Sequence, residues 1–537
     1  MLSALLVTLA TTPSAPPPSA PPPMIYDLAE YEWIVVFGAL AAFFAAFGIG
    51  ANDVANAYAT SVGSKALTIK QACFLAVIFE FIGATFLSTG VTKTIRKGIA
   101  KVDCYEEDPA ILMYGMFSVI LAVGIWLILA TKYEMPVSTT HSCVGGICGM
   151  TIVAKGMGCV VLYKAPFSGF LGVVMSWFFS PILSGLVAMT LFFLIRTFVL
   201  RNKNSFTRAV KVYPILVTLC VTTIAWYMLK KGIKVDKLKM VDADADEAIK
   251  FAIALGIGLV CAVLMIPVYK IMQNRIETGK FVPPVMQIEN VKDAKKTETM
   301  EAGGKTGDEK PEDAPKSGVD KVLKALGEGL NHDVHLAVGV DERTTAVHEN
   351  AEKFDPKTEG FFVYLQIASA IFDSIAHGSN DVANAVGPFA TIYIVFTTGE
   401  VGSKSEMDDN KYWIMALGGV GIGAGLLLYG YQIMRAIGVK LAVITPSRGF
   451  SIEMGSSLIV IIGSFLGIPL STTHCQVGAT TGVALLEGHR GCNKWVLFKT
   501  AIGWVVTCFI VGLMSAGIFA FGAYAPSHGM TYTARAD

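Results

Sequence analysis

Charged residues are scarce in this 537-residue sequence, making up 16% of it against about a quarter in a typical soluble globular chain. They are also unevenly placed: 13 of the 43 Lys and Arg and 17 of the 42 Asp and Glu residues lie between positions 275 and 358. The rest of the chain is dominated by apolar stretches of about 20 residues, long enough to cross a hydrocarbon layer about 30 Å thick. With 53% hydrophobic residues, the sequence predicts an all-α polytopic membrane protein.

Signatures of several other protein classes are missing from the sequence. The ten cysteines form no CxxC pair and show no metal-ligand spacing, and most lie in apolar segments, where a free thiol behaves as a small hydrophobic group. No HExxH, P-loop or nucleophile-elbow motif occurs, so nothing favours an enzyme or a bound cofactor. The net charge of +1 gives no electrostatic basis for nucleic-acid binding.

Twelve apolar segments are candidates for membrane helices. They lie at residues 33–49, 71–91, 110–130, 137–154, 166–199, 213–229, 248–272, 360–388, 412–433, 450–468, 472–486 and 495–523. The segments near Ser138 and Ser471 are short, Gly-rich and polar at one end, which is typical of discontinuous or re-entrant helices.

The hydrophilic parts of the chain divide it into regions. We expect a disordered tail at 1–31, with a cleavable signal as the alternative, and a C-terminal tail at 525–537. Residues 273–359 cannot bury a core by composition, so this loop should be largely disordered. The membrane part then comprises a first unit at 32–199, two connecting helices within 200–272 and a second unit at 360–524.

An internal repeat relates the two membrane units. GANDVANA at 50–57 returns as GSNDVANA at 378–385, and PVSTTH at 136–141 returns as PLSTTH at 469–474. Two separate matches at nearly the same offset indicate a duplication. Five spans per copy with two between them would insert the copies in opposite orientations, so we predict inverted-topology repeats with a site near the membrane midplane.

The first repeated motif places Asp53 and Asp381 within or at the end of apolar spans. An acid at the centre of a membrane helix costs about 2.5–3.5 kcal/mol on insertion scales, and no basic residue lies mid-span to pair with either one. Preceding glycines let the helix break and free backbone carbonyls, and we expect Gly387-Pro388 to end the second element. Carboxylate and amide oxygens suit a small cation. Alternatively, the Asp side chain could carry a proton, or each Asp could form a purely structural ion pair with a Lys or Arg of a neighbouring span. The candidate ligands are Asn52, Asp53, Asn56, Asn380, Asp381 and Asn384.

The second repeated motif is rich in helix-start chemistry, because a proline precedes consecutive hydroxyl residues. A helix that begins inside the membrane directs free N–H groups and the positive end of its dipole at whatever lies before it. Two such starts from opposite sides can enclose a tetrahedral oxyanion, although ordinary capping also explains a single copy. The candidate anion ligands are Ser138, Thr139, Thr140, Ser471, Thr472 and Thr473.

Three histidines accompany these motifs. His141 and His474 end the two STTH elements, and each is as well explained by a hydrogen bond to a neighbouring span as by ligand binding. His377 precedes the second Asp motif and has no counterpart, since Ile49 occupies that place in the first copy. We regard all three as candidates for gating or substrate-linked roles.

Further acids lie in apolar surroundings. Glu80 and Glu453 are not simple repeat mates, and each is interpreted as a cation ligand, a proton acceptor or half of an ion pair, for example with Arg448. Asp373 lies about one helical turn before His377, and its role is open.

Both Asp motifs, both STTH elements and the stretch TPSRGFSIE at 445–453 closely resemble the inorganic phosphate transporter (PiT) family, in particular its eukaryotic sodium-dependent branch. The resemblance covers about residues 32–200 and 360–524. It implies a twelve-span inverted-repeat fold, extracytoplasmic termini and a cytoplasmic long loop. It also implies that Asp53 and Asp381 match the essential acids of the family, and that Glu80 and Glu453 match its functional glutamates.

The resulting hypothesis is a plasma-membrane symporter that imports inorganic phosphate with sodium by alternating access, with no cofactor and sodium as the only metal. Phosphate, sodium and the lipid bilayer are the expected partners, and a homodimer is left open. Proton coupling, another oxyanion such as sulfate or arsenate, and a channel or receptor-like protein without transport are the alternatives. The basic cluster between Arg196 and Lys211 favours a cytoplasmic loop after the fifth span, whereas Lys93 to Lys101 opposes it.

Overall fold

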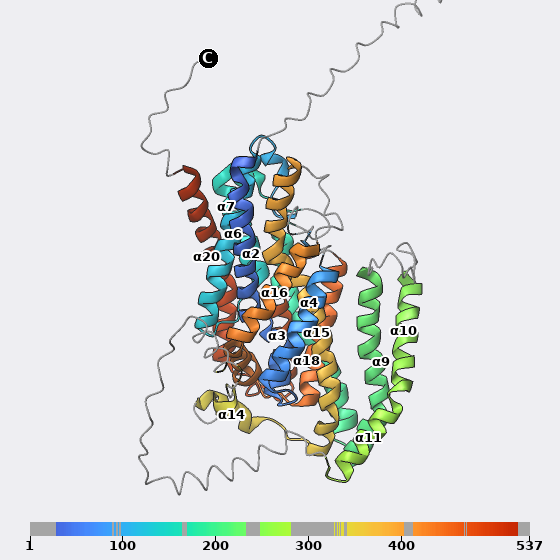
Figure 1. Ribbon diagram of the computed structural model, residues 1–537. Helices are drawn as coiled ribbons and strands as arrows, with labels where there is room; N and C mark the ends of the chain where they lie inside the picture. Colours follow the sequence, from blue (N-terminus) through green and yellow to red (C-terminus); the bar gives the residue numbers. More distant parts are fainter. Residues whose placement is uncertain are drawn as a thin grey trace, which may run out of the picture.

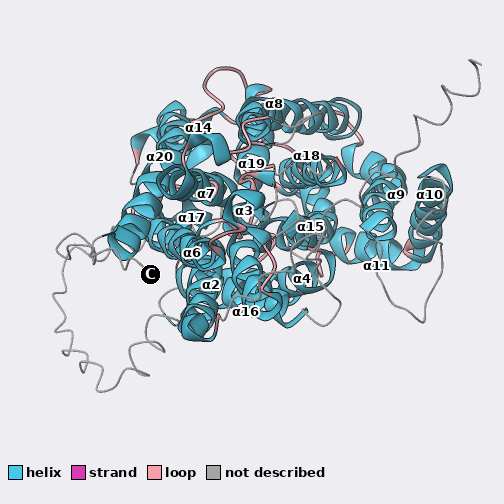
Figure 2. Ribbon diagram, turned by 90° about the horizontal axis from the view of Figure 1, so that it is seen from above, coloured by secondary structure: helices cyan, strands magenta, loops and turns pink. Residues whose placement is uncertain are grey.

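The computed structural model describes residues 28–88, 91–92, 95, 98–163, 169–231, 247–280, 327, 330, 332, 334–337, 341–401, 412–466, 468 and 470–524. Within these residues the chain is helical and contains no strand (Figures 1 and 2). Residues 1–27 of the predicted N-terminal tail, the predicted C-terminal tail and most of the predicted disordered loop lie outside the described residues. The last part of the N-terminal tail was wrongly predicted as disordered, because Ala29–Tyr31 form a short helix that leads into α2. The described end of that loop contains α14 (Glu342–Asn350).

Nine helices of the described part are long and apolar enough to cross a membrane. They are Ala29–Gly63, Ile69–Leu87, Pro109–Lys132, Phe170–Leu200, Ser205–Lys230, Glu247–Leu264, Pro356–Thr398, Tyr412–Tyr429 and Lys494–Tyr524. Three other predicted segments form α7 (Thr139–Lys155), α18 (Pro446–Phe465) and α19 (Thr472–Leu485), which fall outside this set. The all-helical polytopic fold is confirmed, and the count of twelve spans stays a prediction.

The two repeats interlock rather than lying side by side. Helix α2 (Glu32–Asn52) of the first repeat packs along α16 (Tyr412–Tyr429) of the second. In the reciprocal pair, α15 (Pro356–Thr398) packs along α4 (Ile69–Leu87). This exchange is the pattern expected for two copies related by a pseudo-two-fold axis.

The same exchange recurs at the other pair of interfaces. Helix α7 packs along α20 (Lys494–Tyr524), while α19 packs along α8 (Phe170–Ile195). Helix α6 (Pro109–Lys132) lies between, against α2, α7 and α20. Each repeat therefore supplies packing surface for the helices that carry the motifs of the other.

Glycine permits the close contact between α2 and α16. A Cβ atom at Gly50 would lie 1.8 Å from the carbonyl oxygen of Ile422, and one at Gly425 would lie 1.8 Å from that of Phe47. No side chain fits at either place, so the two backbones touch directly, as is common where membrane helices cross.

The two connecting helices stand at one edge of the bundle. Helices α9 (Ser205–Lys231) and α10 (Glu247–Leu264) pack against each other, and α11 (Ile266–Glu277) follows α10 (Figures 1 and 2). Contact with the repeats is made mainly through α9 and α15.

The repeated Asp motifs adopt different backbones. In the first copy α2 ends at Asn52 and α3 (Ala55–Gly63) begins after a break at Asp53. In the second copy α15 continues without a break to Thr398, so the prediction that Gly387-Pro388 ends this element is wrong. Pro388 has no N–H to offer the Asn384 carbonyl, and the helix continues past it with every residue from Asn384 to Ile392 buried.

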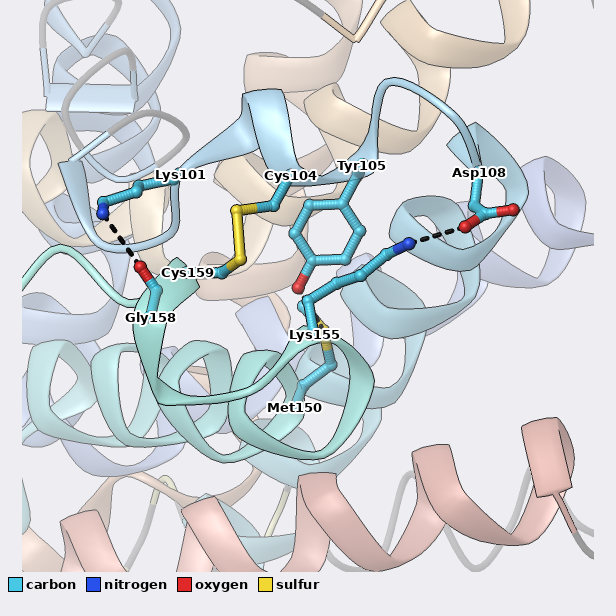
Figure 3. The surroundings of a disulfide bond; sticks show 8 residues. All are labelled: Lys101, Cys104, Tyr105, Asp108, Met150, Lys155, Gly158 and Cys159. Carbon is cyan, nitrogen blue, oxygen red and sulfur yellow. Dashed lines mark hydrogen bonds and ion pairs between the residues drawn. A yellow bond between two sulfur atoms is a disulfide. The ribbon is translucent and has the colours of Figure 1, made fainter.

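A disulfide between Cys104 and Cys159 joins the segment before α6 to the segment after α7, with Cα atoms 6.2 Å apart (Figure 3). Interpreting the cysteines as small hydrophobic groups missed this pair, which lies outside the membrane helices. The remaining eight cysteines are free. Beside the disulfide, Lys101 donates to the Gly158 carbonyl over 2.8 Å.

Candidate functional site at the repeat interface

The two hydroxyl-rich motifs form matching helix starts. Ser138 caps α7 by accepting from the His141 backbone N–H over 3.2 Å, and Ser471 caps α19 by accepting from His474 over 3.3 Å. The threonines that follow form the first turns, and all are buried. Ser138 and Ser471, predicted as anion ligands, therefore use their side-chain oxygens as acceptors for the helix ends.

Asp53 receives hydrogen bonds from both repeats. Its Oδ2 accepts from the Thr139 hydroxyl over 2.8 Å, and its Oδ1 accepts from the Thr473 hydroxyl over 2.5 Å. The amide of Asn56 also donates to Oδ1. The break after α2 thus brings this carboxylate to the starts of both α7 and α19.

Asp381 occupies the equivalent place on α15. The Thr472 hydroxyl donates to its Oδ2 over 2.6 Å, and the amides of Asn380 and Asn384 lie 3.3 and 3.2 Å from its Oδ1. The Thr139 hydroxyl lies 3.3 Å from the same Oδ1. Thr139 therefore lies between the two aspartates, and its single hydrogen is shared between acceptors from two repeats.

The inner asparagines link each Asp motif to the helix start of the other repeat. Asn56 donates to the Thr473 hydroxyl oxygen over 3.2 Å, and Asn384 donates to that of Thr140 over 3.4 Å. These pairs occupy equivalent positions in the two copies. The pseudo-symmetry of the fold thus extends to individual hydrogen bonds.

The outer asparagines hold the chain that leads into each helix start. The side-chain oxygen of Asn52 accepts from the Val137 backbone N–H over 3.0 Å. The amide of Asn380 donates to the Leu470 carbonyl over 3.1 Å. Both residues fix the approach of the helix starts to the aspartates.

The electrostatics of this cluster favour a cation. Asp53 and Asp381 are 1% and 0% exposed, and no Lys or Arg of the described residues forms an ion pair with either carboxylate. The nearest basic group is His377, whose Nε2 lies 3.0 Å from Asp381 Oδ2. One ligand atom each from Asp53, His377 and Asp381 lies within 4.8 Å of the others, a spacing at which the three can hold a metal ion. Two buried carboxylates this close need a compensating charge.

His377 also joins this cluster to Glu80. Its Nδ1 lies 2.9 Å from Glu80 Oε2, and the Ser374 hydroxyl donates to Glu80 Oε1 over 3.0 Å. Glu80 and Asp381 therefore lie on opposite sides of one imidazole ring.

Glu453 forms a separate cluster with hydroxyl and amide donors. It accepts from Thr60 over 2.5 Å, from Ser61 over 3.0 Å, from Ser369 and from Gln366 over 3.4 Å. Sequence reasoning missed these four partners. The regular spacing of polar residues along α3 and the first half of α15 would have indicated them.

The suggested pairing of Glu453 with Arg448 is wrong. Arg448 points toward the end of α19, where it lies 2.6 Å from Glu487. Nearby, Arg196 and Arg201 both contact Glu352, and the hydrogen bonds from Arg201 lower the pKa of Glu352. The basic residues in this region therefore pair with acids near the helix ends, away from the buried carboxylates.

The remaining candidates lie in other surroundings. Asp373 accepts from Ser457 over 2.5 Å. The rings of His141 and His474 lie 4.5 Å apart, each against a tryptophan, and their nitrogens have no hydrogen-bond partner among the described residues. Among the described residues, neither histidine forms a hydrogen bond to Asp53 or Asp381, so their gating role stays a prediction.

A helical bundle of two interlocked repeats, with helix starts and buried acids meeting between them, is the architecture of a membrane transporter. The sequence pattern of the Phosphate transporter family matches residues 49–515, and the chain belongs to this family. The resemblance seen in the motifs is thereby confirmed.

Individual relatives agree with this placement. The chain is 30% identical to the phosphate-repressible phosphate permease of Neurospora crassa, over 94% of this chain and 99% of that protein. It is 28% identical to sodium-dependent phosphate transporter 1 of Rattus norvegicus, over 95% and 97% of the two chains. A solved structure titled "The sodium-dependent phosphate transporter" superposes with a TM-score of 0.67 at 30% identity, covering 91% of this chain and 98% of that one.

Proposed function

We propose that this protein is a secondary-active symporter that imports inorganic phosphate with sodium across the plasma membrane by alternating access. The observation that carries the proposal is the meeting of Asp53 and Asp381, one from each repeat, at the hydroxyl of Thr139. The names of its relatives support the substrate and the coupling ion.

Sodium fits the oxygen-rich surroundings of the aspartates. Carboxylate, hydroxyl and amide oxygens are hard ligands, and a sodium ion beside Asp53 or Asp381 supplies the charge that no Lys or Arg of the described residues provides. Glu453, with its ring of hydroxyls, is a further candidate for a cation.

The threonine hydroxyls at the helix starts link sodium binding to phosphate binding, because each has one hydrogen to donate. While the carboxylates are bare, Thr139, Thr472 and Thr473 donate to them. A sodium ion on a carboxylate oxygen displaces such a donor, which can then turn to an oxyanion. The starts of α7 and α19 add backbone N–H groups and positive dipole ends for phosphate. Sodium thus prepares the phosphate site.

The membrane potential supplies the energy of transport. Moving one net positive charge inward releases about 2.3 kcal/mol per 100 mV, so excess sodium charge carries the anion against its own gradient. Rocking of one repeat against the other would expose the site to each side in turn.

A second candidate, proton-coupled phosphate transport, is favoured by one observation. His377 bridges Glu80 and Asp381, at 2.9 and 3.0 Å, and such a chain of titratable groups can carry a proton.

Phosphate uptake into proteoliposomes tests both candidates. We expect saturable uptake that disappears when choline replaces sodium at constant pH, and that is lost in Asp53→Asn and Asp381→Asn. Asp108→Asn, which alters an acid outside the cluster, is the matched control. Uptake that persists in choline and follows an imposed pH gradient would establish proton coupling instead, and uptake unaffected by both Asp→Asn variants would refute the site.

A further inference from the structure

A cavity of about 840 Å³ lies between α14 and the start of α20, away from the ion cluster. Arg343 and Glu349 line it from α14, while Arg490, Lys494 and Trp495 line it from the segment that joins α19 to α20 and from the first turn of α20. The cavity therefore lies between the hydrophilic segment and the membrane bundle.

The described residues that line this cavity carry a net positive charge. Glu349 is the only carboxylate among them, against Arg343, Arg490 and Lys494. None of these three cations forms an ion pair within the part of the chain that the structure describes. Such a cavity attracts an anion, and several unpaired cations suit one carrying more than one phosphate.

The disulfide identifies the side of the membrane that the cavity faces. Helix α20 begins at Lys494 beside the cavity, and at its other end Tyr524 donates to the Val153 carbonyl over 3.2 Å. Val153 lies in the last turn of α7, just before Cys159 of the disulfide. A helix of 31 residues is about 46 Å long, so cavity and disulfide lie on opposite sides of a bilayer. Since disulfides persist in oxidising compartments, the cavity faces the cytoplasm.

Aromatic side chains place the cavity at the level of lipid headgroups. The guanidinium of Arg343 lies 5.4 Å from the ring centre of Trp495, and the ammonium of Lys499 lies 5.3 Å from it. Trp495 is 47% exposed, and it stacks on the 55%-exposed Phe498 at 5.9 Å. An exposed tryptophan at the end of a spanning helix is typical of the membrane–water interface.

We propose that this cavity binds the phosphorylated headgroup of an anionic lipid of the cytoplasmic leaflet, of the phosphatidylinositol phosphate class. Basic pockets beside membrane helices on this side are suited to such headgroups. Arg343 contacts the headgroup from α14, and Arg490 and Lys494 contact it from the second repeat. The bound lipid holds α14 against α20, which in turn packs along α7 of the ion site.

Binding of water-soluble dioctanoyl phosphatidylinositol 4,5-bisphosphate to the purified full-length protein tests the proposal. We expect saturable binding that weakens about 25-fold in Arg490→Gln/Lys494→Gln, or about five-fold for each charge removed. The matched control, Lys203→Gln/Lys211→Gln, removes two exposed charges from the segments around the start of α9 and should change affinity less than two-fold. Unchanged thermal unfolding of both variants confirms that they are folded.

Three outcomes would overturn the proposal. The first is equal loss of affinity in the two double variants, which indicates only general attraction to a basic surface. The second is equal affinity for dioctanoyl phosphatidylserine, which carries one phosphate. The third is equally tight binding of inositol 1,4,5-trisphosphate, which identifies a soluble ligand rather than a lipid. In Arg343→Gln, affinity should fall about five-fold, which tests the part assigned to α14.

Discussion

His377 Nδ1 lies 2.9 Å from Glu80 Oε2 and joins α15 of the second repeat to α4 of the first. The helices touch beside this pair, because a Cβ atom at Gly378 would lie 2.4 Å from the Glu80 carbonyl oxygen. Among the described histidines, only His377 contacts the aspartate cluster, and it has no counterpart in the other copy. The two halves of the aspartate cluster are therefore not equivalent.

Replacing His377 by Gln should separate sodium coupling from proton coupling. The variant loses the imidazole between two carboxylates, and one hydrogen bond to a charged group is worth about 1.5–3 kcal/mol, so we expect uptake to fall at least ten-fold. Under sodium coupling the remaining uptake still requires sodium at every pH. Remaining uptake that has lost its pH dependence while needing no sodium would contradict the sodium mechanism.

Removing the hydroxyl shared by the two aspartates should weaken phosphate binding. We expect Thr139→Val to raise the KM for phosphate about ten-fold, because one donor to a charged group is lost. Thr481→Val is a suitable control, since that hydroxyl donates to the carbonyl of Val477 in its own helix. The KM is measured as initial uptake rates at saturating sodium. Equal KM values for the two variants would show that the Thr139 hydroxyl does not contribute to phosphate binding.

The close crossing of α2 and α16 should be intolerant of a single methyl group. Gly425→Ala places a Cβ atom where the Phe47 carbonyl oxygen lies, so the helices must separate and the thermal unfolding temperature in detergent should fall. Gly256→Ala is the control: nothing lies within 4 Å of its Cβ position in α10, and alanine should stabilise that helix by about 0.5–1 kcal/mol. A fall of the same size in both variants would contradict this interpretation of the crossing.

The disulfide should stabilise the folded protein by about 2–4 kcal/mol. We expect Cys104→Ser/Cys159→Ser to unfold at a lower temperature than the unaltered protein and to be insensitive to added reductant. The unaltered protein treated with reductant should approach the variant. Cys261→Ser, which changes a free thiol in α10, controls for loss of a cysteine.

The ion pairs of Glu352 predict a dependence of stability on pH. Hydrogen bonds from Arg201 and Arg196 lower its folded pKa below the unfolded value of about 4.3. The contribution of Glu352 to the free energy of unfolding is therefore complete above the unfolded pKa and is lost as pH falls through the folded pKa. Because the group is partly exposed, Glu352→Gln should cost only about 0.5–1 kcal/mol at pH 7. A difference that persists unchanged at pH 3 in thermal unfolding would refute this assignment.

Motif duplication made the central part of the site predictable. Helix-start chemistry at Thr139 and Thr472, together with acids at Asp53 and Asp381, depends on local sequence, and the structure brings these side chains together. Features that depend on long-range packing were not accessible. The partner of Arg448 is Glu487 rather than Glu453, and Cys104 meets Cys159 across 55 residues, because neither pairing leaves a trace in the nearby sequence.

The continuity of α15 shows the same limit. Gly387-Pro388 has the composition of a helix end, yet the helix continues through it where α15 is buried against neighbouring helices. Local chemistry predicted where the chain could bend, and the surrounding helices determined that it bends only in the first copy.

One bond in the cluster has consequences for biosynthesis. Thr473 follows Asp53 by 420 residues, which a ribosome needs about 20–80 s to add. Throughout that interval the Asp53 carboxylate of the newly inserted first repeat lacks the hydrogen bond from Thr473. The polar cluster around Asp53 is therefore completed late in biosynthesis, and a chain truncated before the second STTH element lacks this donor to a buried acid.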